Sequence, residues 1–202
     1  MRSAQISLAG LNAIAIRVSF TGDLGWEIYV AETDQAALYD AIFDAGKEFG
    51  LVPVGGRSLL SLRVEKGYGS WGREYSPEYW PQEVGLDRLI KMQKTDFLGK
   101  EAYAGLMDKA PREKLVMLEV DVSWNADASG GEPVFAKDGT AIGRVSSGAY
   151  GYTVEKSLAL AFVKTDYAEP GAELDVAVLG LQHGATILDR PPFDPDGVRL
   201  RS

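Results

Sequence analysis

The sequence predicts an α+β protein in which a β-hairpin and helices precede a small C-terminal β-barrel. Alternating apolar residues predict the hairpin over residues 13–30, and apolar residues at helical spacing follow it. After Pro111, six short strand patterns succeed one another without an intervening helix, which favours a barrel or a sandwich. We therefore divide the chain into an α+β part, residues 1–112, and a barrel, residues 113–202.

The composition is that of an ordinary globular protein, with 46% hydrophobic and 25% charged residues among 202. Zero cysteines exclude a disulfide scaffold, a thiolate nucleophile and a zinc site with cysteine ligands. The sequence has neither an apolar run of roughly 18–20 residues nor the apolar core of a signal peptide. We therefore expect no membrane association and a cytoplasmic location.

The chain carries 21 basic and 29 acidic residues, a net charge of −8, which argues against a nucleic-acid partner. Its single histidine, His183, cannot form a cluster of histidine ligands or a pair of histidine bases, and we expect no metal site. Any chemistry must therefore rest on carboxylates, arginine, tyrosine or a bound cofactor.

The hairpin has one face that we expect to be buried and one that we expect to be open. Gly22 and Gly25 mark its turn. The residues expected on the buried face are Ile14, Ile16, Val18, Phe20, Trp26, Ile28 and Val30. Glu27 and Tyr29 share the opposite face of the second strand.

Three helices are predicted in the α+β part. The first runs from Thr33, a suitable N-cap, to about Phe49. The second covers residues 57–66 between glycines. The third is capped by Asp96 and ends near Lys109.

Residues 67–96 have no regular pattern and are rich in aromatic residues. So long a connection is uncommon unless it packs against the protein or lines a site. Its aromatic side chains therefore form either a small core or a stacking surface for a flat ring. They are Tyr68, Trp71, Tyr75 and Tyr79.

The barrel strands are predicted at short intervals, with Lys137-Asp138-Gly139 as a hairpin turn between two of them. The segments are residues 115–122, 132–136, 141–147, 157–163, 173–178 and 183–187. The proline-rich tail from Arg190 is either a strap or a loose end. One hairpin is too little sheet to cover the predicted helices, so we expect the α+β part to be a fragment of a larger domain.

Four sequence motifs occur in the order found in one known family. They are T-G-D-L-G-W-E at residues 21–27, G-G-R-S-L-L-S-L-R-V-E-K-G at 55–67, D-F-L-G-K-E-A at 96–102, and G-R-V-S-S-G at 143–148 with L-A-L-A-F-V at 158–163. In these motifs the chain resembles the folate-dependent aminomethyltransferases, the T-protein of glycine cleavage and its relatives. The resemblance implies a tetrahydrofolate-binding α+β domain followed by a β-barrel.

Residues 23–29 and 73–78 are most similar to the folate domains at the C-terminus of dimethylglycine and sarcosine dehydrogenases. In those proteins an upstream flavin domain oxidises an N-methyl group, and the folate domain captures the one-carbon unit. The resemblance implies tetrahydrofolate as cofactor, a small N-methyl amine as substrate, and FAD in an upstream domain. Because no G-x-G-x-x-G follows a strand, we expect no flavin site in this chain itself.

The resemblance covers the C-terminal half of the family's folate domain. The family's catalytic aspartate lies in the N-terminal half, so we assign no catalytic residue in this chain and expect the chain alone to be inactive. The reaction implied is attack of a folate nitrogen, N5 or N10, on an iminium carbon, with the protein orienting the reactants.

Four residues are assigned to cofactor binding on this resemblance and on their chemistry. Glu27 is expected to accept the paired N–H donors of the pterin ring in a fork geometry, with Tyr29 beside it. Arg57 begins its helix, where the macrodipole disfavours a cation unless an anion such as the glutamyl tail pairs with it. Tyr150, in a glycine-flanked turn, is expected to cover the site. The alternatives are that Glu27 is only solvated, that Arg57 is only exposed, and that Tyr150 contacts no ligand.

The sequence therefore predicts part of a tetrahydrofolate-dependent aminomethyltransferase or N-methyl amine dehydrogenase that passes a methylene unit to the folate. Glu65 is expected to be structural, paired with Lys66 or with a neighbour of Arg57. A folate-dependent demethylase of the same fold and a non-enzymatic interaction module remain as alternatives. Folate binding by the complete domain separates the interaction module from the other two.

Overall fold

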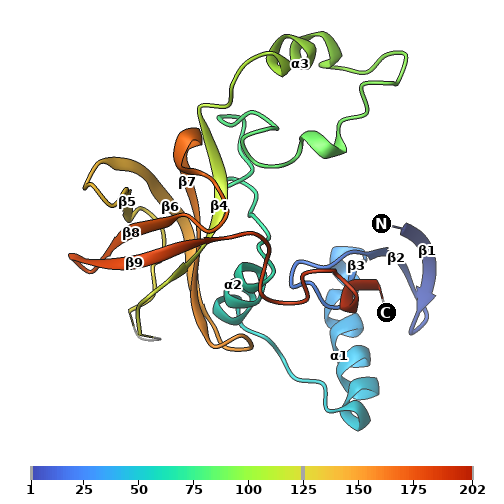
Figure 1. Ribbon diagram of the computed structural model, residues 1–202. Coiled ribbons are helices and arrows are strands. Elements are labelled where there is room, and N and C mark those ends of the chain that lie inside the picture. Colours follow the sequence, from blue (N-terminus) through green and yellow to red (C-terminus); the bar gives the residue numbers. More distant parts are fainter. Residues whose placement is uncertain (1, 124–125, 202) are drawn as a thin grey trace.

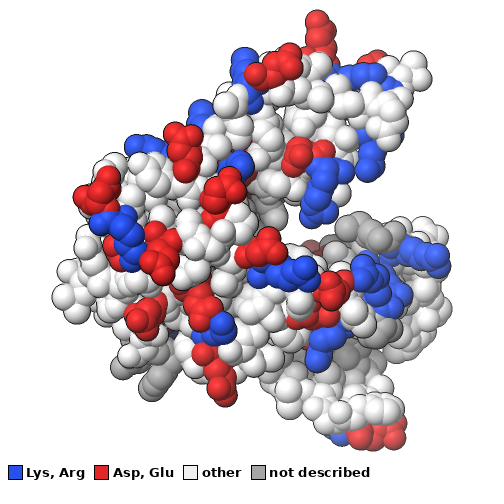
Figure 2. Space-filling model, in the orientation of Figure 1, with Lys and Arg blue, Asp and Glu red and all other residues white. Residues whose placement is uncertain are grey.

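The computed structural model describes residues 2–123 and 126–201, and it has the expected α+β class with a C-terminal barrel. Figure 1 shows a small N-terminal sheet beside helix α1, a helix α2 between that sheet and the barrel, and an arm carrying α3 that extends away from both. Acidic and basic side chains are interspersed over the face drawn in Figure 2. No helix within the described residues has the length and apolar character that crossing a bilayer requires.

The N-terminal sheet has three antiparallel strands in the order β1-β2-β3. Their bounds are Arg2–Leu8, Leu11–Arg17 and Trp26–Tyr29. The expectation of a two-stranded hairpin is therefore wrong by one strand. Residues 3–8 do alternate polar and apolar, so a period-two signal for β1 was present in the sequence and was overlooked.

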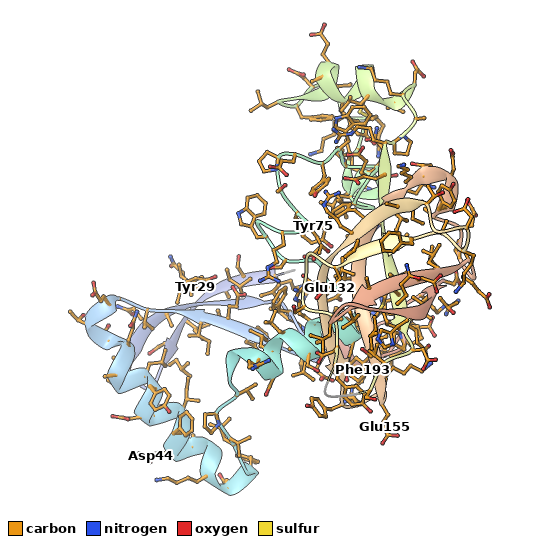
Figure 3. All side chains as sticks on the ribbon, turned by 90° about the vertical axis from the view of Figure 1, so that its left-hand side faces the viewer. Tyr29, Asp44, Tyr75, Glu132, Glu155 and Phe193 are labelled. Atoms are coloured by element: carbon orange, nitrogen blue, oxygen red, sulfur yellow. The ribbon has the colours of Figure 1, made fainter. Side chains whose placement is uncertain are left out.

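The strands alternate as predicted, but the buried face of β2 is the opposite one. In β3 the face is as predicted, since the half-buried Ile28 lies opposite the buried Ala15. Ala13 and Ala15 are buried, whereas Ile14 between them is 44% exposed. Trp26, also expected in the core, is exposed. Figures 1 and 3 show α1 lying along one side of this sheet. The prediction failed because hydropathy ranks isoleucine above alanine but does not tell which face of a sheet is covered.

The first helical segment consists of three consecutive pieces. They are the 3₁₀ helix η1 (Glu32–Asp34), α1 (Gln35–Gly46) and the 3₁₀ helix η2 (Lys47–Phe49). Gly50 ends the segment in the left-handed conformation, with a φ of 70°. Thr33 is not the N-cap of α1, since Asp34 occupies that position and Thr33 lies inside η1.

The other two helices differ in how well they were predicted. Helix α2 (Gly56–Glu65) lies within one residue of its predicted bounds. Helix α3 (Lys100–Met107) begins after Gly99 instead of at Asp96. The Asp96 carboxylate accepts the backbone N–H of Phe97 (2.8 Å), which is too local a contact to cap the helix. The 3₁₀ helix η3 (Asp87–Leu89) lies in the same arm as α3.

The aromatic residues of the loop differ in their surroundings. Tyr79 stacks on Phe162 of the barrel with ring centroids 3.9 Å apart. Tyr75 packs against Gly69, where a Cβ would lie 2.7 Å from its ring. Trp71, in contrast, is exposed. The small-core interpretation therefore describes Tyr75 and Tyr79, and the stack of Tyr79 attaches the base of the arm to the barrel.

Six antiparallel strands close into a barrel in the order β4-β7-β6-β5-β8-β9. Their bounds are β4 (Glu113–Val120), β5 (Pro133–Phe135), β6 (Ala141–Gly151), β7 (Lys156–Lys164), β8 (Glu173–Val178) and β9 (Leu181–Leu188). Each strand overlaps one predicted segment, and Lys137-Asp138-Gly139 lies in the turn between β5 and β6. The 3₁₀ helices η4 (Thr165–Tyr167) and η5 (Arg199–Arg201) follow β7 and β9.

The interior of the barrel holds the main hydrophobic core. Along β8, for example, the buried Leu174, Val176 and Val178 alternate with partly buried residues, as a filled small barrel requires. Large apolar side chains of the α+β part remain exposed instead; they include Ile14, Tyr29, Tyr39, Phe49, Val52 and Leu60. Most of the buried apolar surface therefore lies in the barrel.

Gly143 in β6 approaches β7 so closely that a Cβ there would overlap the carbonyl oxygen of Phe162. We expect Gly143→Ala to lower the free energy of unfolding by about 1–3 kcal/mol, the range for overpacking a core. Gly184→Ala in β9 is the control, because a Cβ at Gly184 meets no atom within 4 Å. Urea denaturation measures both variants, and equal losses would contradict the close approach of β6 to β7.

Candidate functional site

The turn between β2 and β3 is shaped by one serine and two glycines. Ser19 Oγ accepts the backbone N–H groups of Thr21 (3.2 Å) and Gly22 (3.0 Å). Gly22 has a φ of 87°, which favours glycine. A Cβ on Gly25 would lie 2.8 Å from the carbonyl oxygen of Val18. The spacing T-G-x-x-G therefore encodes the turn that leads directly into the strand with Glu27.

Glu27 and Tyr29 lie on the same face of β3 and are joined by a hydrogen bond. The Tyr29 hydroxyl donates to Glu27 Oε2 (2.5 Å), and both residues are exposed. The hydrogen bond to Glu27 and the negative charge of its carboxylate raise the pKa of Tyr29 above its ordinary value. The phenol therefore remains a donor at neutral pH and orients the carboxylate.

Arg57 and Tyr150 line one cavity of about 1080 Å³ between α2 and the barrel. On α2, Ser61 Oγ donates to the carbonyl oxygen of Tyr150 (2.6 Å), and the Tyr150 N–H donates to Asp127 (3.0 Å). The ring of Tyr152 packs edge-on against that of Tyr150, with centroids 5.1 Å apart. Hydrogen bonds thus hold the wall of the cavity, and the exposed Arg57 supplies a positive charge to it.

The four residues assigned from the sequence thus form two pairs in different places. Within the described residues, no hydrogen bond or shared cavity joins the Glu27–Tyr29 pair to the Arg57–Tyr150 pair. One pair offers a carboxylate and the other a guanidinium with aromatic rings. This combination suits a ligand with paired N–H donors at one end and an anion at the other. No group of three or more acidic or histidine side chains converges on a metal position in the described part of the chain.

A buried ion pair that the sequence analysis missed joins α2 to the aromatic loop and to the barrel. Arg63 Nη1 lies 3.4 Å from Glu74 Oε2, and both side chains are fully buried. Arg63 also donates to Ser147 Oγ (2.7 Å) and to the carbonyl oxygen of Tyr68 (3.0 Å). Glu74 accepts the backbone N–H of Ser70 (2.7 Å). The sequence signal was weak, because α2 has no clear apolar stripe and the partner comes from an irregular loop.

A β-bulge in β6 turns two consecutive serines toward Glu74. The register between β6 and β7 shifts between Val145 and Ser147. Ser146 Oγ and Ser147 Oγ both donate to Glu74 Oε1, at 2.6 and 2.5 Å. Consecutive residues of a regular strand point to opposite faces and cannot share one acceptor in this way. The bulge is therefore part of the buried cluster.

Glu65 and Lys66, at the end of α2, are buried but do not pair with each other. Glu65 Oε1 accepts the backbone N–H of Thr153 (2.7 Å), whereas the Lys66 ammonium binds Asp194 of the tail. The expected Glu65–Lys66 pair is wrong, because adjacent helix residues point in different directions. Glu65 still has a structural role, since it attaches the turn between β6 and β7 to α2.

Two family models match successive parts of the chain. The GCVT N-terminal domain matches residues 1–94. The glycine cleavage T-protein C-terminal barrel domain matches residues 113–194, which contain the barrel strands. The chain belongs to the glycine cleavage T-protein family. The Glu27 turn and α2 therefore fall in the N-terminal domain of this family, and the bulged β6 falls in its barrel.

Relatives of this T-protein family chain include dimethylglycine dehydrogenases and aminomethyltransferases. The mitochondrial dimethylglycine dehydrogenase of Rattus norvegicus is 38% identical over 202 residues, which are 100% of the chain and 23% of the relative. An aminomethyltransferase of Symbiobacterium thermophilum is 34% identical over 188 residues, 92% of the chain and 49% of the relative. The chain thus spans half or less of the curated relatives that it matches.

A solved structure has the same fold. The glycine cleavage system aminomethyltransferase T from Bartonella henselae superimposes with a TM-score of 0.82 at 22% sequence identity. The match covers 91% of the T-protein family chain and 50% of that structure. At this identity the likeness concerns the fold alone.

Removing the charge of Glu74 is expected to destabilise the T-protein family chain strongly. Glu74→Gln leaves Arg63 buried without a counter-charge, and we expect a loss of about 3–5 kcal/mol in the free energy of unfolding. Glu119→Gln is the control, because its ion pair with Lys156 is partly exposed (37% and 40% for the two side chains). Such a pair contributes at most about 1 kcal/mol. Similar losses in urea denaturation at pH 7 would contradict the importance of the buried pair.

The contribution of Glu74 is also expected to depend on pH. Burial by itself would raise the pKa of Glu74, but hydrogen bonds from Ser146, Ser147 and Ser70 and the charge of Arg63 outweigh it and hold the pKa below its ordinary value. A depressed folded-state pKa stabilises the protein above the ordinary glutamate pKa, and this stabilisation is lost as the pH falls through the folded value. The stability difference between wild type and Glu74→Gln should therefore shrink in acid. Denaturation at a series of pH values measures it, and a difference that does not change would refute the assignment.

Proposed function

We propose that the chain is the C-terminal half of a tetrahydrofolate-binding domain, with residues 1–112 in the folate-binding part and 113–202 as its barrel domain. We also propose that the complete gene product transfers a one-carbon unit from a small N-methyl amine or aminomethyl donor to tetrahydrofolate. Membership in the T-protein family supports the chemistry. The single observation that carries the assignment to this chain is the Glu27 carboxylate, exposed on β3 and held by Tyr29 at 2.5 Å.

Glu27 is proposed to bind the pterin ring. A carboxylate accepts two neighbouring N–H donors at once, and such charge-assisted pairs are stronger than neutral hydrogen bonds. The Tyr29 hydroxyl contacts Oε2, and it restricts the rotation of the carboxylate on a strand that is itself fixed by pairing with β2. The side chain thus loses little conformational freedom when the ligand binds.

Arg57 and Tyr150 are proposed to bind the anionic end of the same ligand. Arg57 is the second residue of α2, where the helix dipole disfavours its charge and an anion in the cavity compensates. Tyr150 offers an apolar ring surface on the opposite wall. A cavity of about 1080 Å³ is large enough for part of a folate.

Bound tetrahydrofolate would supply the nitrogen that accepts the one-carbon unit. The residues of this chain are proposed to bind and orient it, and not to form a covalent intermediate. The catalytic carboxylate is proposed to come from the N-terminal half of the domain, and FAD from an upstream domain. On this proposal the 202-residue chain alone is inactive. A cytoplasmic location stays a prediction.

Glu27→Gln is expected to weaken tetrahydrofolate binding by the complete gene product. Loss of a charged hydrogen-bond partner corresponds to about 10–100-fold in affinity. Glu32→Gln is the matched control, since Glu32 is another exposed carboxylate of the same part and lies in η1. Isothermal calorimetry with tetrahydrofolate measures wild type and both variants.

Three results of this titration decide the proposal. A weaker Glu27→Gln with an unchanged Glu32→Gln supports it. Unchanged affinity in a folded Glu27→Gln variant removes Glu27 from the site. Failure of the wild-type gene product to bind tetrahydrofolate overturns the function itself and favours a non-enzymatic interaction module.

A further inference from the structure

The C-terminal tail returns from the barrel to the N-terminal sheet, and of its two expected roles it has that of a strap. Figure 1 shows the tail leaving β9, passing α2 and ending beside β3. Pro191 lies against Gly67, where a Cβ would be 2.8 Å from the proline Cγ. The Phe193 N–H donates to the carbonyl oxygen of Glu65 (3.4 Å). The tail therefore follows the C-terminal end of α2.

A buried ion pair fixes the tail to α2. The Lys66 ammonium lies 3.3 Å from Asp194 Oδ2 and also donates to the Asp194 carbonyl oxygen. The two side chains are only 6% and 10% exposed. A buried lysine needs a partner of opposite charge, and the tail provides it from 128 residues farther along the chain.

The stem of the same lysine supports the turn that leads to Glu27. A Cβ on Gly22 would lie 2.5 Å from Lys66 Cδ and 2.7 Å from Cγ, so the turn rests directly on the methylene groups. Gly22 is itself buried and is fixed by its hydrogen bond to Ser19. Any displacement of Lys66 is therefore transmitted to the turn.

Asp194 folds the end of the tail back toward the same turn. It has a φ of 41°, and its carboxylate accepts the backbone N–H groups of Val198 (2.9 Å) and Arg199 (3.2 Å). Arg199 Nε in turn donates to Asp23 Oδ1 (2.5 Å), next to Gly22. The tail is thus linked to the turn directly through Arg199 and indirectly through Lys66, which binds Asp194 and contacts Gly22.

We propose that Lys66 and Asp194 are positioning residues for Glu27. This inference rests on the proposed function, in which Glu27 binds tetrahydrofolate. β3 is only four residues long, and among the described strands it pairs only with β2, so its position depends on the turn before it as well as on that pairing. Glu27 follows that turn by two residues. Without the ion pair, the turn loses its support and the carboxylate loses its fixed direction.

The buried pair, and not the contact between Arg199 and Asp23, is assigned this role. Arg199 and Asp23 are 63% and 41% exposed, and an ion pair in that environment contributes little. The side chains of Lys66 and Asp194 are almost excluded from solvent. Removing the charge of either one therefore leaves the other charge buried without a counter-charge.

Two variants remove the ion pair between Lys66 and Asp194 and change the side-chain volume little. Asp194→Asn keeps an acceptor oxygen and a side chain that tolerates the left-handed conformation, but it removes the charge. Lys66→Met keeps most of the stem beneath Gly22. Asp196→Asn is the control, because Asp196 lies in the same tail and pairs with Arg190 on the surface.

The first measurement needs no ligand. In the 202-residue chain, Asp194→Asn and Lys66→Met should speed the amide hydrogen exchange of residues 21–29 by about tenfold, the effect of freer local opening. The amides of β7 and the control variant should be unchanged. If Lys66→Met fails to fold, the milder Asp194→Asn decides alone. Unchanged exchange in residues 21–29 overturns the inference.

The second measurement tests whether the effect passes through Glu27. In the complete gene product, Asp194→Asn should lower tetrahydrofolate affinity by about tenfold, and by less than about twofold when Glu27→Gln is already present. A general loss of stability would lower both backgrounds equally and would overturn the positioning role. If the wild type binds no tetrahydrofolate, the proposed function fails, and the exchange measurement still decides whether the pair holds the turn.

Discussion

The buried ion pair between Arg63 and Glu74 is the contact on which the arrangement of the other elements depends. Burying two charges is costly. The cost is offset by the hydrogen bond that Arg63 donates to the carbonyl oxygen of Tyr68 and by those that Glu74 accepts from Ser146 and Ser147. These partners come from α2, the aromatic loop and the bulged β6. A shift of any of the three elements would leave a buried charge without its counter-charge or without one of its hydrogen bonds. Since hydrogen bonds have direction and apolar contacts do not, the cluster fixes the rotation of α2 as well as its position.

The rotation of α2 determines where the two candidate pairs lie. Arg57 stands in the first turn of the helix, and Lys66 follows its last residue. A helix of 10 residues is about 15 Å long. One short rigid element therefore presents the cation to the cavity beside Tyr150 and supports the turn before Glu27. Helix α2 thus links the carboxylate of Glu27 to the guanidinium of Arg57, although no direct contact joins the two groups within the described residues.

The sequence predicted those elements that depend on residues close together in the chain. The six barrel strands follow from short apolar segments and from turns such as Lys137-Asp138-Gly139, and α2 follows from the glycines around it. The buried face of β2 was predicted wrongly, because Ile14 is more hydrophobic than Ala13 yet lies on the open side. The Arg63 cluster was missed because its partners lie 11 and 84 residues away. Charge pairs between distant segments leave no periodic trace, and neither does the pair of Lys66 with the tail.

The bulge in β6 gives that strand a fixed length. A deletion there would restore the regular ladder with β7, but one serine would then face away from Glu74. An insertion would carry Gly148 away from the carbonyl oxygen of Ala128, against which it now lies without room for a side chain. A Cβ at Gly139, in the turn between β5 and β6, would meet no atom within 4 Å, so that turn has space that β6 lacks. An insertion or deletion in an outer turn of the barrel therefore disturbs the structure less than one in β6, the strand that contacts α2.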